Sequence, residues 1–254
     1  MLDVAFQFDY IGMSDVGLVR EQNEDIWAAF PEIGVFLLAD GMGGHASGEI
    51  AAKEAVDFLS QLIREWDPSK ETTLELGLTF FREAVQKMNH HIFQESQADP
   101  SLKGMGTTLC ALHFFKFYAI LAHVGDSRIY LQRGSKLNRL TEDHSLVSEL
   151  VEMEAMKAED AQTFPYKHVL TRAIGTHPVV EPTLNSIIVE PHDLFMLCSD
   201  GLTNYVSDKE IAETLATNDS LKAKGQQLIN AANNQGGGDN ITLILVDVVN
   251  DLPR

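Results

Sequence analysis

Four aspartates stand where an apolar run of residues meets a glycine-containing turn. Asp40 ends VFLLAD, Asp126 follows FYAILAHVG, Asp200 ends LFMLCSD, and Asp239 comes just before NITLILVDV. A carboxylate at the end of a buried strand is held by rigid structure yet stays open to ligands. Asp-Gly pairs are also ordinary turn formers, and each pair alone fits that interpretation. Four such sites in one chain instead favour carboxylates that gather at one rim of a sheet.

Carboxylates that lie close together repel one another, and proteins usually offset this repulsion by binding a divalent cation. Ligand sets made only of oxygen favour hard ions such as Mg²⁺ or Mn²⁺, whereas structural zinc prefers Cys and His sets that this chain does not offer. Ca²⁺ is an alternative, although no DxDxDG loop occurs. Two hard ions polarise a phosphoryl oxygen and acidify water, which is the chemistry of phosphoester hydrolysis. Gly41, beside Asp40, has no side chain, so its carbonyl oxygen can approach such an ion.

A phosphate substrate also needs a cation supplied by the protein. The segment GLVREQNED at 17–25 offers Arg20, with Glu24 and Asp25 close behind it. The planar guanidinium matches the oxygen atoms of a phosphate group well. An arginine beside acids can also be a simple surface ion pair, and the segment alone does not separate the two interpretations.

Composition and net charge limit the classes of protein to which this chain can belong. The chain has 254 residues, 44% of them hydrophobic, and a formal net charge of -18. We expect a single domain over 1–254, most of whose acids form a solvated surface. The charge excludes nucleic acid as a natural partner, because phosphate binding needs clustered Lys and Arg. With no signal peptide and no apolar run of about 18 residues, we expect a cytoplasmic protein without a membrane partner. We also expect a monomer. Cys110 and Cys198 lie in apolar runs, as buried reduced thiols do.

Hydrophobic periodicity predicts an α+β domain without regular βαβ alternation. We expect strands at 4–10, 35–40, 184–189, 193–198 and 241–249, and two strands within 107–132 joined across 125–127. We expect helices at 48–66, 74–92, 207–217 and 219–233, the third starting with a capping box of Ser207 and Glu210. The segment at about 143–181 is charged and has a helical first half, so we interpret it as an excursion from the main body.

Seven motifs together carry a family resemblance. They are REQNED (20–25), LLADGMGGHASGEIAA (37–52), GMGTTL (104–109), AHVGDSRIYL (122–131), LTRAIG (170–175), LCSDGL (197–202) and GGGDNITLILV (236–246). In this order they resemble the metal-dependent, type 2C Ser/Thr protein phosphatases, the PPM family, and DGMGGH is similar to the bacterial branch. The resemblance covers about residues 10–247.

The resemblance implies a four-layer α-β-β-α sandwich with a central antiparallel β-sandwich and a binuclear Mn²⁺ or Mg²⁺ centre at one end. By position, Asp40 would bridge two ions, the Gly41 carbonyl would bind one, and Asp200 and Asp239 would hold the other. Arg20 would bind the substrate phosphate. Glu24, Asp25 and Asn240 would support these ligands from behind. Asp126, with Asp200, would hold a third, weaker ion, and the segment 143–181 would form a flap beside the site.

The implied reaction is direct attack of a metal-activated water on a phosphoserine or phosphothreonine monoester, with phosphorylated proteins, targets of a Ser/Thr kinase, as substrates. Some members have DGHGG, whose histidine is proposed as the general acid, but this chain has Met42 there. His45 or a metal-bound water are the alternatives. A cysteine-based phosphatase needs Arg six residues after Cys, and Lys116 and Asn204 stand there instead. The alternative is a binding module that keeps the fold but has lost catalysis. Such a protein should lack at least one metal-ligand residue, and here every ligand position is filled.

Overall fold

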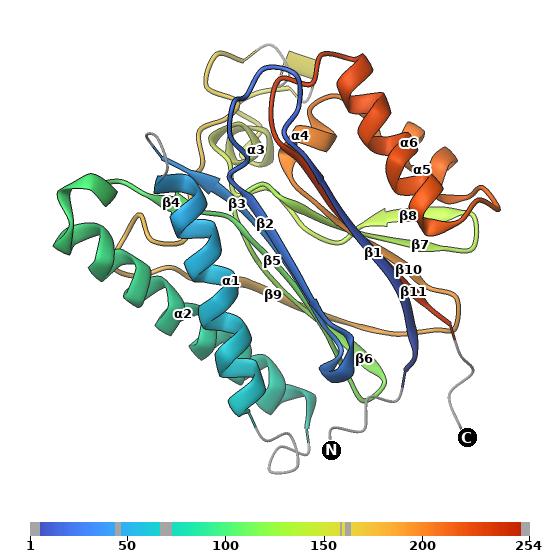
Figure 1. Ribbon diagram of the computed structural model, residues 1–254, viewed down its shortest axis with the longest axis horizontal. Helices are drawn as coiled ribbons and strands as arrows, with labels where there is room; N and C mark the ends of the chain where they lie inside the picture. Colours follow the sequence, from blue (N-terminus) through green and yellow to red (C-terminus); the bar gives the residue numbers. More distant parts are fainter. Residues whose placement is uncertain (1–5, 44–46, 67–72, 158, 161–163, 250–254) are drawn as a thin grey trace.

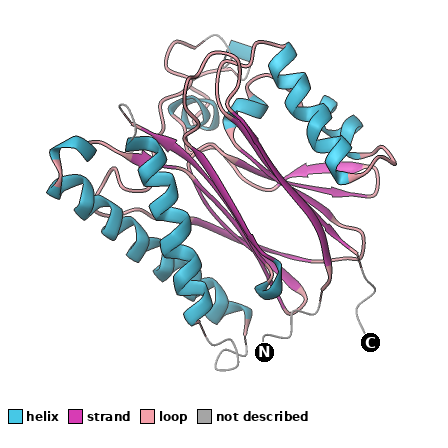
Figure 2. Ribbon diagram, viewed as in Figure 1, coloured by secondary structure: helices cyan, strands magenta, loops and turns pink. Residues whose placement is uncertain are grey.

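Two antiparallel sheets stacked face to face form the centre of the molecule. The computed structural model describes residues 6–43, 47–66, 73–157, 159–160 and 164–249. Helices cover the outer face of each sheet, so that the layers run helix, sheet, sheet, helix (Figures 1 and 2). The predicted α+β class and four-layer sandwich are therefore confirmed.

Each sheet takes strands from distant parts of the chain. The five-stranded sheet has the order β1 (Phe8–Asp15), β11 (Ile241–Val248), β10 (Leu194–Cys198), β7 (Arg128–Arg133) and β8 (Lys136–Arg139). The second sheet has the order β2 (Asp25–Phe30), β3 (Val35–Met42), β5 (Leu109–Phe115), β6 (Tyr118–Val124) and β9 (Thr183–Ile188), with the short β4 (Gly106–Thr107) paired to β3. The chain thus crosses repeatedly between the two layers.

Helices from two regions of the chain cover the sheets. On the second sheet lie α1 (Ser47–Glu65) and α2 (Leu74–Ala98), and on the five-stranded sheet lie α4 (Asp200–Thr203), α5 (Asp208–Leu215) and α6 (Leu221–Asn234). The helix α3 (Leu146–Glu152) belongs to the excursion. Short 3-10 turns lie at Pro31–Ile33 and Pro100–Leu102. In the part of the chain that the structure describes, no helix is both long and apolar enough to cross a membrane.

The continuous apolar runs are explained by burial on both faces of the strands. Along β3, Val35, Leu37 and Ala39 point toward α1 and α2, whereas Phe36 and Leu38 point toward the other sheet. Successive side chains of a strand alternate between its faces. A strand sandwiched between a helix layer and a sheet must therefore be apolar at every position, which is what VFLLA shows.

Several element predictions differ from the structure. Residues 107–132 form three longer strands after β4, because β5 and β6 are joined by a tight hairpin at Lys116, whose φ of 55° is left-handed. The residues 125–127 join β6 to β7, which lie in different sheets. Strands β2 and β8 had no prediction, and α2 continues six residues beyond 92, to Ala98. The first strand starts at Phe8 and continues to Asp15, and Val4 lies outside the described residues.

Candidate active site

A cleft of about 650 Å³ opens at one end of the sandwich. It is lined by all but one of the residues predicted to bind metal or phosphate or to support those ligands: Arg20, Glu24, Asp40, Gly41, Asp126, Asp200, Asp239 and Asn240. The exception, Asp25, lies directly behind the cleft, where its neighbour in the β2–β3 register is Asp40. The chain therefore brings its separated acidic positions to one place.

Each of the two sheets contributes two aspartates to the cleft. Asp40 lies near the end of β3 and Asp126 follows β6, so both belong to the second sheet. Asp200 follows β10 as the first residue of α4, and Asp239 precedes β11, so both belong to the five-stranded sheet. The expectation of carboxylates at one rim holds, but the rim is shared by two sheets.

Hydrogen bonds fix the backbone around Asp40. Its N–H donates to Thr108 Oγ1 at 2.9 Å, and its carbonyl oxygen accepts from the Thr108 N–H and the Thr107 hydroxyl, both at 2.9 Å. The Gly41 N–H donates to the Glu24 carbonyl at 3.1 Å. A Cβ added at Gly41 would lie 2.1 Å from the carbonyl oxygen of Gly48. Close backbone packing against α1 therefore requires glycine here, in addition to any approach of a ligand.

Asn240 organises the loop that carries Arg20. Its Nδ2 donates to the carbonyls of Val16 and Gln22 at 3.0 and 2.9 Å, and its Oδ1 accepts from the Glu24 N–H at 2.8 Å. The side chain of Asn240 thus ties the β1–β2 loop to the start of β11. Arg20 Nη2 then donates to Asp239 Oδ2 at 2.8 Å, across the mouth of the cleft.

A hydroxyl joins the two sheets beneath the cleft. Ser199 Oγ donates to Asp25 Oδ2 at 2.8 Å and accepts from the Thr242 N–H at 3.0 Å. Asp25 belongs to β2, whereas Ser199 and Thr242 belong to the other sheet. The sequence motifs contained Ser199 in LCSDGL, but only the fold shows that it supports the acidic group.

Burial and mutual repulsion raise the pKa of several of these carboxyls. Burial is the main cause for each. It raises the pKa of Asp25 to about 7, with contributions from the charges of Asp200 and Asp239, and that of Asp126 to about 8, with contributions from Asp200 and Asp143. The pKa of Asp40 lies well above its ordinary value, and that of Asp200 is also raised. These four carboxyls therefore lack enough positive charge around them to offset their burial and mutual repulsion.

The donor set fits hard divalent cations. Carboxylate and carbonyl oxygens are the ligands that Mg²⁺ and Mn²⁺ prefer, and such ions would supply the missing positive charge. Among the described residues, the three ligand atoms of Glu54, His91 and Glu95 form the only His, Cys or acidic group within 4.8 Å of one another, and they lie on α1 and α2. The aspartates of the cleft are more widely spaced, so ions there would draw them closer or use backbone and water oxygens as well.

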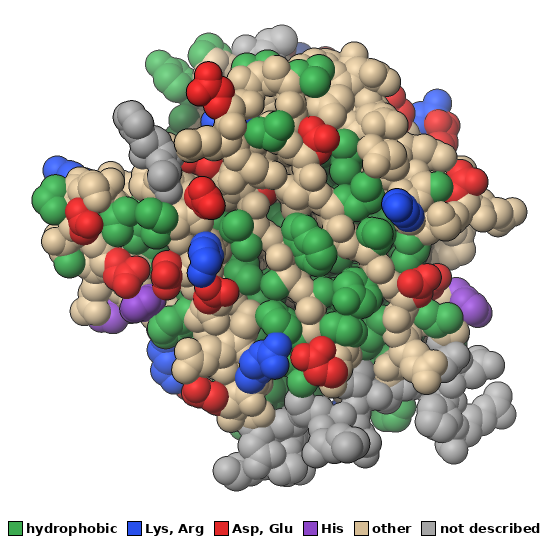
Figure 3. All heavy atoms as spheres, in the orientation of Figure 1, with side chains coloured by type: hydrophobic (Ala, Val, Ile, Leu, Met, Phe, Trp, Pro, Cys, Tyr) green, Lys and Arg blue, Asp and Glu red, His purple; other side chains and the backbone are tan. Residues whose placement is uncertain are grey.

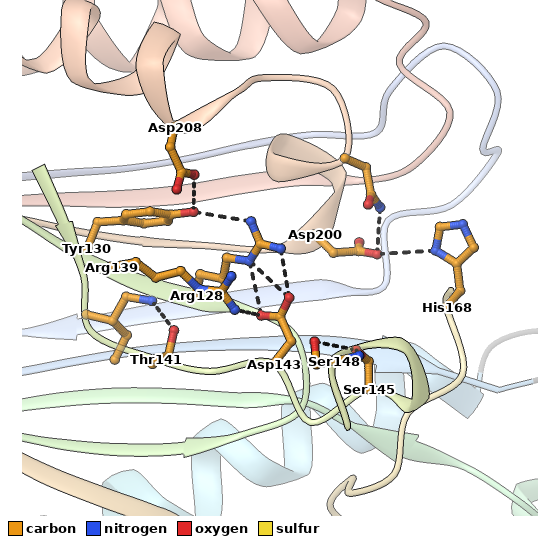
Figure 4. Close-up of polar contacts among 12 residues, drawn as sticks. Arg128, Tyr130, Arg139, Thr141, Asp143, Ser145, Ser148, His168, Asp200 and Asp208 are labelled. Atoms are coloured by element: carbon orange, nitrogen blue, oxygen red, sulfur yellow. Dashed lines mark hydrogen bonds and ion pairs between the residues drawn. The ribbon is translucent and has the colours of Figure 1, made fainter. Parts of the chain in front are cut away.

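The structure adds cleft residues that the sequence did not single out as site residues. Asn204 Nδ2 donates to Asp200 Oδ2 at 2.8 Å, and His168 Nδ1 lies 3.9 Å from the same oxygen atom (Figure 4). His168 and Lys167 belong to the excursion, which therefore contributes an imidazole and an ammonium group to the acidic cleft. Asn204 lies four residues after Asp200, a helical spacing that could have suggested the contact. His45 lies outside the described residues.

Comparison with known proteins gives the family. Residues 19–245 match the family model described as protein phosphatase 2C. A serine/threonine phosphatase, stp, of Listeria welshimeri is 40% identical over 241 residues, which cover 92% of this chain and 93% of that protein.

Solved structures agree with this assignment. The Mycobacterium tuberculosis serine/threonine phosphatase PstP/Ppp has a TM-score of 0.87 and 37% identity, covering 96% of this chain and 99% of that one. The catalytic domain of PstP in complex with 2 manganese ions has a TM-score of 0.84, with 37% identity and the same coverage. Because sequence and fold agree over more than 90% of its length, the chain belongs to the bacterial branch of the protein phosphatase 2C family.

Proposed function

We propose that this chain hydrolyses phosphoserine and phosphothreonine monoesters in proteins with the help of two Mn²⁺ or Mg²⁺ ions. Asp40, the Gly41 carbonyl, Asp200 and Asp239 would hold these ions, and Asp126 with Asp200 would hold a third, weaker one. The observation that carries the proposal is the convergence of acidic residues from both sheets on one cleft whose carboxyl pKa values are raised. The manganese complex of a phosphatase with the same fold supports the choice of ions.

Arg20 is the group of the protein that would bind the substrate phosphate. Its side chain is 48% exposed at the mouth of the cleft, and among the described residues only Asp239 holds it by a hydrogen bond. A guanidinium has five N–H donors, so the remaining donors can face phosphate oxygens. Asp239 thereby orients Arg20 toward the place where the phosphoester would lie.

The remaining chemistry follows from charge and orientation. When bound, the cations supply a nucleophile by lowering the pKa of water, and they neutralise charge on the phosphoryl oxygens. Asp25, Ser199 and Asn240 keep the carboxylates and the Arg20 loop in place through the hydrogen bonds described above. Direct, single-step transfer of the phosphoryl group to water is the mechanism that this arrangement favours.

The buried thiols give no alternative nucleophile. Both Cys110 and Cys198 are free and buried, as predicted. Burial raises the pKa of the Cys198 thiol to about 12 and that of Cys110 well above its ordinary value. Because the thiolate is the reactive form, neither residue is suited to attack a phosphoester at neutral pH.

The proposal is tested by turnover of p-nitrophenyl phosphate and of phosphoserine and phosphothreonine peptides with Mn²⁺, before and after chelation. Asp40→Asn and Asp239→Asn should each lower kcat by about 100-fold or more, because each removes a charged ligand. The matched control is Asp9→Asn, which changes an exposed carboxyl near the start of β1 and should leave kcat unchanged. Full Mn²⁺-dependent activity of a folded Asp239→Asn protein would refute the assignment of ligands.

A further inference from the structure

His144 lies at the base of the excursion and is bonded twice to the turn that carries Asp126. Its backbone N–H donates to the Gly125 carbonyl at 2.7 Å, and its ring Nδ1 accepts from the Gly125 N–H at 3.1 Å. The side chain is 3% exposed. Both polar groups of the Gly125 backbone are therefore occupied by one residue, and Gly125 directly precedes Asp126 in the chain.

The other ring nitrogen of His144 is also engaged. Nε2 lies 2.9 Å from Thr183 Oγ1, at the start of β9. Since Nδ1 accepts a hydrogen bond, a neutral ring carries its hydrogen on Nε2 and donates it to Thr183. Burial lowers the pKa of His144 to about 4, so the ring is neutral at physiological pH. The imidazole thus has one fixed tautomer and orientation between the turn and β9.

The opposite side of the turn is equally constrained. A Cβ added at Gly125, whose φ is 105°, would lie 2.6 Å from Cγ2 of Thr108. Thr108 is also the residue whose hydroxyl oxygen accepts from the Asp40 N–H. The turn is therefore held between Thr108, which belongs to the Asp40 network, and His144, which belongs to the excursion.

Further bonds join the two chain segments on either side of the turn. Asp143 accepts from Arg128 through both carboxylate oxygens, at 3.0 and 2.7 Å, and the Ile129 N–H donates to Thr141 Oγ1 at 3.1 Å (Figure 4). Arg139 also pairs with Asp143. Residues 140–144 therefore run along residues 125–129 as one bonded unit.

The start of the excursion pairs with residues 169–171 of the same segment at this place. The Thr171 N–H donates to the His144 carbonyl at 2.9 Å, and the Leu146 N–H donates to the Val169 carbonyl at 2.8 Å. Ser145 forms an isolated bridge with Leu170, and its side chain begins α3 as the N-cap. A displacement of this base would be transmitted to Gly125 through His144.

We propose that His144 is a positioning residue that sets the place of the Asp126 carboxylate and couples it to the base of the excursion. This inference rests on the proposed function, in which Asp126 with Asp200 holds the weaker cation. When the excursion shifts, the paired His144–Gly125 bonds move the turn with it, so affinity for that cation follows the position of the excursion.

Two amide substitutions separate the two ring contacts. The side-chain oxygen of Asn in His144→Asn can take the place of Nδ1 and accept from Gly125, whereas the longer Gln in His144→Gln reaches toward Thr183 instead. We expect His144→Gln to raise the Mn²⁺ concentration for half-maximal turnover about tenfold, and His144→Asn to change it by less than about threefold. The change should match that of Asp126→Asn in direction.

Three controls make the test specific. His113→Gln alters another buried histidine, which packs among the rings of Trp66 and Phe81 near the far end of β5, and should leave the Mn²⁺ dependence unchanged. Thr183→Val keeps both Gly125 bonds and should also leave it unchanged. Adding His144→Gln to Asp126→Asn should cause no further shift, since residues that act through one another are not additive.

Mn²⁺ binding, followed by electron paramagnetic resonance, gives a readout independent of turnover. The weakest binding step should be weakened in His144→Gln and retained in His144→Asn, with the tighter steps unchanged. If His144→Gln does not fold, hydrogen exchange of the wild-type protein serves instead: filling the weak site should slow exchange at the Gly125 and Thr171 amides, but not in Asp126→Asn.

The outcomes are distinguishable from failure of the proposed function. A wild-type protein without Mn²⁺-dependent turnover would overturn the proposed function, while the binding measurement would still decide the role of His144. A folded His144→Gln protein whose Mn²⁺ binding matches the wild type, or whose effect adds fully to that of Asp126→Asn, would overturn the role given to His144. Hydrogen exchange at the Gly125 amide that does not change when Mn²⁺ is added would also overturn this role.

Discussion

At the scale of single residues, the aspartates of the cleft combine burial with mutual repulsion. The folded protein would be more stable if these carboxyls were either protonated or neutralised by cations. Burial is the main cause that raises the pKa of Asp25 to about 7 and the pKa of Asp126 to about 8. A site prepared for cations is therefore a source of instability without them.

This repulsion predicts the pH dependence of the metal-free protein. Aspartates of the unfolded chain titrate near pH 3.9, so between about pH 4 and pH 8 these carboxyls bind more protons in the folded state than in the unfolded state. Their contribution to the free energy of unfolding should therefore fall as the pH rises through this window. Asp126→Asn should reduce the slope by up to about 1.4 kcal/mol per pH unit. Urea unfolding of chelated samples measures both slopes, and identical slopes would contradict the account.

At the scale of elements, sequence patterns predicted the parts whose signals are local. The helix near 207–217 is present as α5, with both bonds of its capping box formed by Ser207 and Glu210. The strand at 35–40 is present within β3 because an apolar run needs burial on both faces. By contrast, β8 is an edge strand of the sequence KLNR without an apolar pattern, and the hairpin at Lys116 has no glycine. Both depend on tertiary contacts.

The capping box gives a prediction for α5. In Ser207→Ala the Glu210 N–H loses its acceptor, which should lower the free energy of unfolding by about 1 kcal/mol. Ser207→Asp, which restores an acceptor, should recover most of it. Thermal unfolding followed by circular dichroism measures the change, and turnover of p-nitrophenyl phosphate should be the same in all three proteins. An equal loss in both variants would show that the cap contributes little.

The candidate site was only partly predictable from the sequence. Asp40, Asp126, Asp200 and Asp239 were accessible because each ends or begins a buried run beside glycine. Their proximity depends on how the two sheets stack, and periodicity alone does not determine that arrangement. His168 approaches Asp200 through the path of the excursion, whose composition predicts little regular structure, so only coordinates could place it.

At the scale of the whole molecule, the excess of acid is a property of the surface as well as of the cleft. The net charge of the chain is -18. On the face shown in Figure 3, acidic side chains are scattered over the surface and basic side chains are few. A field of one sign extends over about a Debye length and acts on approaching substrates. Phosphoproteins with basic surroundings should therefore meet the enzyme more often than acidic ones.

This field predicts opposite salt effects on two phosphopeptides. With an acidic phosphopeptide, kcat/KM should rise about threefold between low and moderate ionic strength, because salt screens the repulsion. With a basic peptide that carries the same phosphoserine, kcat/KM should fall. Initial rates at fixed Mn²⁺ and increasing KCl measure both trends, and equal responses of the two peptides would rule out long-range steering.

The division of the acidic residues between two sheets has a consequence for how the protein unfolds. Asp40 and Asp126 come from one layer of the core, and Asp200 and Asp239 come from the other. Any ion bound by oxygens of both layers would fasten them together at this end. Loss of the metal ions would thus weaken the contacts between the two sheets at the same end where catalysis takes place. The inactive, metal-free enzyme would therefore also be the form most accessible to cellular proteases.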